Sequence, residues 1–159
     1  MNLMEYIDKG GIIVYILIAL NIIGFTIILW KLFTLPRKNA MIKKIKTKVQ
    51  TAGQSSIYAQ IEYEVKKLET GLTYIKNIAT IAPLLGLLGT VIGVYKSFEA
   101  ISQSGLGDPT VFSNGIAIAL ITTIAGLIVA IPHHLAYNHF ISALDAIELK
   151  AKKDITGLE

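Results

Sequence analysis

The stretch GGIIVYILIALNIIGFTIILW, residues 10–30, contains no charged side chain. A helix rises 1.5 Å per residue, so a run of this length crosses the roughly 30 Å hydrocarbon core of a bilayer. A secretory signal peptide is the competing interpretation. Glu5 and Asp8 argue against it because they stand where a basic segment belongs, and no small-residue cleavage site follows. The sequence therefore predicts a membrane-spanning first helix.

The composition indicates further crossings. Hydrophobic residues make up 53% of the 159 residues and charged residues only 16%, which is too apolar for an ordinary soluble domain. A second apolar run lies between Lys76 and Lys96, and a third lies between Pro109 and Ile141. We therefore expect an all-α membrane protein with three transmembrane helices. These helices are placed at residues 10–35, 77–97 and 110–132.

The charged residues gather in blocks between the apolar runs. Nine lysines and arginines stand in the segment from Arg37 to Lys76 against three glutamates, and three more lysines lie near the C-terminus. By the positive-inside rule, these blocks are expected on the cytoplasmic side. Segments 36–76 and 133–159 are then cytoplasmic helical extensions. The N-terminal segment 1–9 and the turn 98–109 face the opposite side, which gives a multi-pass protein with an outer N-terminus and a cytoplasmic C-terminus.

Apolar residues recur at helical spacing within the basic segment and predict two amphipathic helices. The first contains Met41, Ile45 and Val49, and the second contains Ile57, Ile61, Val65 and Leu68, with a break at Gly53 to Ser56. At the end of the first apolar run, Trp30 and Lys31 are expected to form an interfacial anchor of an aromatic ring and a snorkelling amine.

Small residues recur along the second and third apolar runs. They are Gly86, Gly89, Gly93, Gly115, Ala119 and Gly126. Small residues let helix backbones approach closely, so these positions are predicted to serve helix packing. They leave little bulk for packing an isolated three-helix unit, so we expect them to form contacts between subunits.

Threonines also lie in these runs. Thr80, Thr90, Thr122 and Thr123 can each hydrogen-bond a carbonyl one turn earlier in their own helix, and such a bond needs no functional explanation. Thr90 and Thr123 lie on the small-residue stripes near the middle of their helices. Those two are therefore the candidates for hydroxyls that line a polar pore.

Every Asp and Glu lies outside the three apolar runs. Proton relays through membranes normally use an intramembrane Asp, Glu or His, so a partner would have to supply the carboxylate. His133, His134 and His139 point in different directions on a helix and form no metal pair. We interpret them as interfacial histidines with structural roles. The sequence has no catalytic triad, phosphate loop, metal-ligand spacing or nucleic-acid motif, and we expect no enzyme activity and no cofactor.

Two motifs resemble those of the MotA/TolQ/ExbB proton channel family. The segment APLLGLLGTVIG at residues 82–93 resembles the second-helix motif of this family. The pattern from Gly115 through Thr122-Thr123, Gly126 and Pro132 to Asn138 resembles the third-helix motif. Together these motifs cover roughly residues 79 to 138. The three predicted crossings and the short chain look more like ExbB or TolQ than MotA.

The resemblance implies an ExbB-like channel subunit of the inner membrane that assembles as a homopentamer. Its partners would be a single-pass ExbD-like protein with an intramembrane aspartate and a TonB-like protein that energises outer-membrane import. The family threonines map onto Thr90 and Thr123. A glutamate usual on the third helix is replaced by Ile118, so its proton-path role cannot be transferred.

Other functions remain open at this point. A TolQ-like role in cell-envelope integrity fits the same motifs. A structural scaffold, with protons carried only on the partner, is favoured by the missing glutamate at Ile118. A flagellar stator role is the third alternative, and it is the one least consistent with the short chain.

Overall fold

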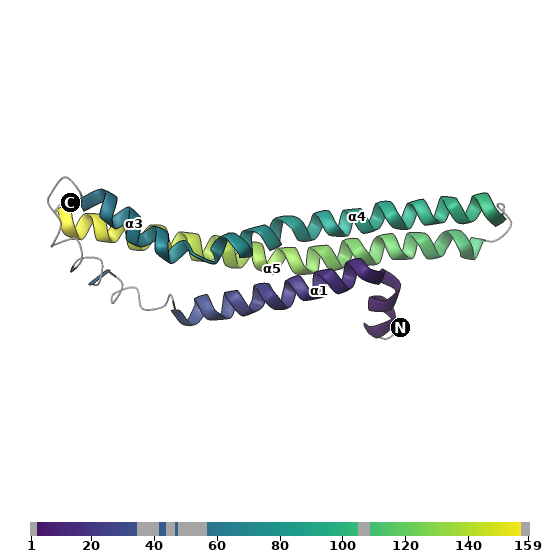
Figure 1. Cartoon of the computed structure of the whole chain (residues 1–159), viewed down its shortest axis with the longest axis horizontal. Coiled ribbons are helices and arrows are strands. Elements are labelled where there is room, and N and C mark those ends of the chain that lie inside the picture. Colours follow the sequence, from purple (N-terminus) through teal and green to yellow (C-terminus); the bar gives the residue numbers. More distant parts are fainter. Residues whose placement is uncertain (1–2, 35–41, 44–46, 48–56, 105–108, 157–159) are drawn as a thin grey trace.

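The computed structural model describes residues 3–34, 42–43, 47, 57–104 and 109–156. Its long helices are α1 (Leu3–Thr34), α3 (Ile57–Glu69), α4 (Leu72–Ser104) and α5 (Pro109–Thr156). Figure 1 shows α4 and α5 side by side in a long hairpin, with α1 along its middle and α3 along the far end of α5. The fold is therefore all-helical, as predicted.

Within the residues that the structure describes, three helices are long and apolar enough to cross a membrane, which agrees with the three predicted spans. They are longer than predicted, because α4 covers residues 72–104 and α5 runs unbroken from 109 to 156. The sequence had suggested a boundary in α5 after Pro132. The helix continues beyond this proline because Phe140, Leu144 and Ile147 are buried in a cluster shared with α3.

The α4–α5 hairpin is held by direct approach of the two backbones. A methyl group added at Gly126 would lie 2.7 Å from the Ala82 carbonyl oxygen, and one at Gly93 would lie 2.6 Å from that of Gly115. Only glycine fits where backbones come this close. The two small-residue stripes therefore face each other within one chain. The expectation that they form contacts between subunits is wrong, because the α4–α5 contact already occupies them.

Helix α1 is broken near its start. Gly11 has φ 61° and ψ −154°, which interrupts the helical path, and the segment Leu3–Gly10 folds back as a short hook (Figure 1). The Tyr15 hydroxyl donates a hydrogen bond of 2.9 Å to the Asp8 carboxylate across this bend. Glycine suits the position because φ in this range is costly for residues with a Cβ. The first span was predicted to begin at residue 10, close to this break.

Below the hook, α1 packs into the hairpin through a small buried cluster. Ile13 and Leu17 of α1 meet Ile78 of α4 and Val129 of α5 there. Branched aliphatic side chains from all three spans thus share one core. This cluster fixes the position of α1 relative to the α4–α5 pair.

The other end of α1 is joined to the corner between α3 and α4. Lys31 is only 5% exposed, and its amine donates a 2.7 Å hydrogen bond to the Leu68 carbonyl in the last turn of α3. A cation at a helix C-terminus satisfies carbonyls that have no partner within the helix. The prediction of a snorkelling Lys31 is therefore wrong, because the side chain turns inward. Of the two residues of the predicted anchor, only Trp30 is exposed, at 59%.

The second predicted amphipathic helix is α3. Its Ile61 and Val65 are buried against Leu144 and Ile147 of α5, in the register that the helical spacing had indicated. The first predicted amphipathic helix and the break at residues 53–56 fall largely outside the described residues. Residues 105–108 of the predicted turn also lie outside them.

The close α4–α5 contact predicts the effect of one added methyl group. Gly126→Ala should lower the midpoint of thermal unfolding, because its Cβ meets a backbone carbonyl and overpacking costs about 1–3 kcal/mol. Ser113→Thr adds a methyl group at an exposed position of the same helix and serves as the control. Unfolding is followed by size-exclusion chromatography of heated, detergent-solubilised protein. Equal midpoints for the two variants would contradict the packing described.

Candidate functional site

Thr90 of α4 and Thr123 of α5 face each other across the hairpin. Their hydroxyl oxygens are 2.5 Å apart, and both side chains are half-buried. The sequence had placed these residues on separate stripes, and the structure brings them into direct contact. The pair is therefore a single polar unit within one chain.

Two backbone carbonyls complete this unit. The Thr90 hydroxyl donates to the Ala119 carbonyl at 3.1 Å or to that of Gly86 at 3.3 Å, and the Thr123 hydroxyl lies 3.5 Å from the Gly86 carbonyl. Each hydroxyl has one proton to donate and can also accept. If Thr90 donates to a carbonyl, Thr123 donates to Thr90, and the reverse order ends on the Gly86 carbonyl. The pair thus has two hydrogen-bond directions.

The glycines explain how the threonines meet. The Gly86 backbone lies so near α5 that an added methyl group would be 2.8 Å from the Thr122 carbonyl oxygen. The Thr122 side chain lies directly over Gly89, where an added Cβ would collide with it. The missing side chains let α5 approach until the hydroxyls on the two helices touch. A bulkier residue at either glycine would separate the pair.

The other two threonines behave as ordinary helical threonines. Thr122 is fully buried and donates to the carbonyls of Ile118 and Ala119, both at 3.0 Å. Thr80 is exposed and donates to the Lys76 carbonyl at 2.9 Å. These hydroxyls bond within their own helices, as the competing interpretation of the sequence allowed. They make a useful contrast with Thr90 and Thr123.

Ile118 lies on α5 just before this site. Its side chain is half-buried, so it is less enclosed than Ala119 or Thr122. No Asp or Glu occurs in the sequence from 70 to 98 or from 109 to 144. The parts of α4 and α5 that carry the threonine pair therefore supply no carboxylate.

His133 is a buried polar residue whose environment the sequence did not reveal. It is fully buried, and its Nδ1 donates a 2.7 Å hydrogen bond to the Val129 carbonyl. Its Nε2 has no hydrogen-bond partner among the described residues and packs against Gly24 of α1. The Phe25 ring meets the imidazole edge-on, with centroids 5.3 Å apart. His133 therefore packs between α1 and α5, which the sequence did not indicate.

The other two histidines differ from His133 in burial. His134 and His139 are exposed, and the described residues hold no group of three or more His, Cys, Asp or Glu arranged to bind a metal. A signal for the buried His133 was present in the sequence as Gly24, the one glycine in the middle of the first span. A glycine there leaves room for a large side chain from a neighbouring helix. The periodicity of α5 alone could not show which helix would provide that room.

Comparison with known proteins adds to this geometry. The MotA/TolQ/ExbB proton channel family matches residues 33–153, which include α3, α4 and most of α5. This chain belongs to the MotA/TolQ/ExbB proton channel family. The resemblance inferred from the second-helix and third-helix motifs is thereby confirmed.

Individual relatives in this family carry two different names. An ExbB homologue of Methanothermobacter thermautotrophicus is 28% identical over 182 residues, which cover 91% of this chain and 64% of that protein. The ExbB biopolymer transport protein of Aquifex aeolicus is 41% identical over 83 residues, which cover 52% of this chain and 54% of that protein. The Tol-Pal system protein TolQ of Haemophilus influenzae is 38% identical over 85 residues, which cover 54% of this chain and 37% of that protein. The chain spans less than two thirds of the length of each.

The Gly24–His133 contact predicts a coupled pair of substitutions. Gly24→Ala should destabilise the protein by about 1–3 kcal/mol, because its Cβ collides with the imidazole. The same change in a His133→Ala background should cost much less, since the obstructing ring is gone. A double-mutant cycle on thermal unfolding measures this difference. Additive effects of the two substitutions would show that the side chains do not meet.

Proposed function

We propose that this chain is the channel subunit of a proton-driven motor complex of the bacterial inner membrane, and that it energises TonB-dependent outer-membrane import. The observation that carries the proposal is the Thr90–Thr123 hydroxyl pair, which lies between two membrane spans that contain no carboxylate nearby. Membership of the proton channel family supports the same conclusion. The similarity to proteins named ExbB supports the import role.

The hydroxyl pair suits proton transfer without carrying charge. A charged side chain at the centre of a bilayer is costly, whereas a hydroxyl both donates and accepts. In the proposed mechanism, a carboxylate on the membrane helix of an ExbD-like partner comes level with the pair. Thr90 and Thr123 then orient water or the proton towards that carboxylate. Reversal of the two hydrogen-bond directions resets the pair after each transfer.

A homo-oligomer, proposed as a pentamer, would surround the partner helix. The face of α4 directed away from α5 is apolar and exposed in the single chain, with Leu84 at 60%, Leu87 at 58% and Val91 at 60%. Such a surface suits either lipid or a neighbouring subunit. Thr90 and Thr123 are half-buried, so part of each residue is exposed beside the hairpin. A central pore next to this exposed part gives the pair access to the partner.

Two alternatives have specific support. A TolQ-like role in cell-envelope integrity is supported by the similarity to the TolQ protein of Haemophilus influenzae. A scaffold role, with protons carried only by the partner, is supported by Ile118, because an apolar side chain stands where the family glutamate is expected. The partner bound after purification in mild detergent separates the ExbB-like and TolQ-like roles. The threonine substitutions below separate channel from scaffold.

The proton path is tested by removing both hydroxyls. The double variant Thr90→Val, Thr123→Val keeps the side-chain shapes but removes both hydroxyls, so proton-driven uptake in cells that carry the partner proteins should fall sharply. Expression and oligomer size should stay normal. Thr80→Val is the matched control, because this hydroxyl is exposed and bonds only within α4. Ile118→Ala should matter much less than the double variant. Full uptake by the double variant would refute the channel role and favour the scaffold.

The orientation of the chain in the membrane is tested by cysteine labelling. The lysine blocks place Lys43 and Lys150 in the cytoplasm and Gln103 in the periplasm. The chain has no cysteine, so Lys43→Cys, Lys150→Cys and Gln103→Cys each provide one unique label site. A membrane-impermeant thiol reagent applied to intact spheroplasts should label only position 103. Labelling at 43 but not at 103 would invert the proposed orientation.

A further inference from the structure

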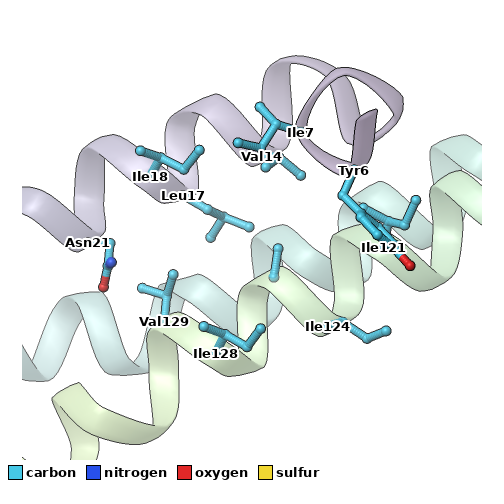
Figure 2. Close-up of a pocket in the computed structure, with 11 residues that line it drawn as sticks. Tyr6, Ile7, Val14, Leu17, Ile18, Asn21, Ile121, Ile124, Ile128 and Val129 are labelled. Atoms are coloured by element: carbon cyan, nitrogen blue, oxygen red, sulfur yellow. The ribbon is translucent and has the colours of Figure 1, made fainter. Parts of the chain in front are cut away.

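A groove of about 490 Å³ opens between the hook, the first turns of α1 after Gly11, and α5. Figure 2 shows Ile18 and Asn21 of α1 on one wall and Ile124 and Ile128 of α5 on the other, with Tyr6 of the hook at the opposite end from Asn21. The threonine pair does not line it. The groove is therefore separate from the candidate proton path.

The lining is almost entirely hydrocarbon. Nine of the eleven residues that line the groove are aliphatic, and the other two are Tyr6 and Asn21. Both walls belong to helices that are long and apolar enough to span a membrane. The hook carries the exposed polar residues Glu5, Asp8 and Lys9, which are suited to the headgroup layer. The groove thus begins below the headgroups and runs into the hydrocarbon layer.

An apolar groove between membrane-spanning helices has two possible occupants, a lipid acyl chain and a helix of a second subunit. An α-helix with its side chains is a rod about 10 Å across, whereas an acyl chain is thin and flexible. The shape of the groove distinguishes between these two occupants.

The hook blocks one end of the groove. A methyl group added at Gly10, in the hook, would lie 3.2 Å from the Ile121 side chain, so the hook crosses the end of the groove and touches α5. A straight membrane-spanning helix cannot pass this obstruction. A flexible chain can bend around the hook and enter from the side. The aliphatic walls then surround it without any polar group to satisfy.

We propose that this groove binds one acyl chain of a phospholipid from the leaflet on the side of the hook. The lipid chain lies between α1 and α5, with its headgroup level with the hook and its methyl end towards Asn21. In this position it supplies part of the packing between α1 and α5. The proposal concerns a surface separate from the threonine pair and does not depend on the proposed channel function.

Photo-crosslinking tests the site directly. The full chain is reconstituted in vesicles of phosphatidylethanolamine and phosphatidylglycerol that contain a phospholipid with a diazirine near the end of one acyl chain. After irradiation, mass spectrometry of peptides locates the attached lipid. We expect adducts concentrated on Ile18, Ile124 and Ile128. Labelling of these residues at only the level of Ile16, which is 43% exposed on the opposite face of α1, would indicate bulk lipid and overturn the proposal.

Two substitutions fill the groove from opposite walls. Ala125→Trp from α5 and Ile18→Trp from α1 should each cause loss of the groove adducts, and the second variant guards against misfolding of the first. Ile16→Trp adds an indole on the opposite face of α1 and should leave the adducts unchanged. Persistence of the adducts in both filled variants would overturn the proposal. Crosslinks from groove residues to a second copy of the chain, in place of lipid, would also overturn it.

Discussion

The backbone contact between α4 and α5 determines the arrangement of the remaining elements. The Gly126 backbone lies against that of Ala82, and the Gly93 backbone lies against that of Gly115, at distances that exclude any side chain. In lipid, where no hydrophobic force drives helices together, such close packing is a principal source of attraction between them. It also sets the relative rotation of the two helices. That rotation brings the hydroxyls of Thr90 and Thr123 together rather than leaving each bonded only within its own helix.

The other contacts attach α1 to this hairpin at three levels. Tyr15 and Asp8 hold the hook at one end, the Gly24–His133 contact lies in the middle, and Lys31 caps α3 at the other end. The Tyr15–Asp8 contact is an exposed hydrogen bond, and the Gly24–His133 contact is close packing. The Lys31 contact is a hydrogen bond from an amine to a carbonyl at the end of α3. The membrane portion of the chain and α3 are therefore joined by side chains as well as by the connecting segment.

Much of the architecture was accessible from the sequence because hydrophobic run length and charge distribution report directly on membrane crossings. The three apolar runs correctly predicted three spans, and the spacing of Ile61 and Val65 correctly predicted the buried face of α3. Glycine spacing indicated close packing, but not which helix would be the neighbour, so the stripes were wrongly assigned to contacts between subunits. The inward turn of Lys31 and the burial of His133 could not be predicted from the sequence for a related reason. Whether a polar side chain turns to water or inward depends on a partner elsewhere in the chain, here the Leu68 carbonyl and Gly24.

The unbroken course of α5 has a mechanical consequence. With 48 residues in one helix, it extends about 72 Å, more than twice the hydrocarbon thickness of a bilayer. It carries Thr123 in one half and the cluster with α3 in the other. The helix continues through Pro132, which removes one backbone hydrogen bond between these two parts and is the place where the helix bends most easily. We therefore expect a tilt imposed near Thr123 to reach Ile147 and Ala151 with Pro132 as its pivot.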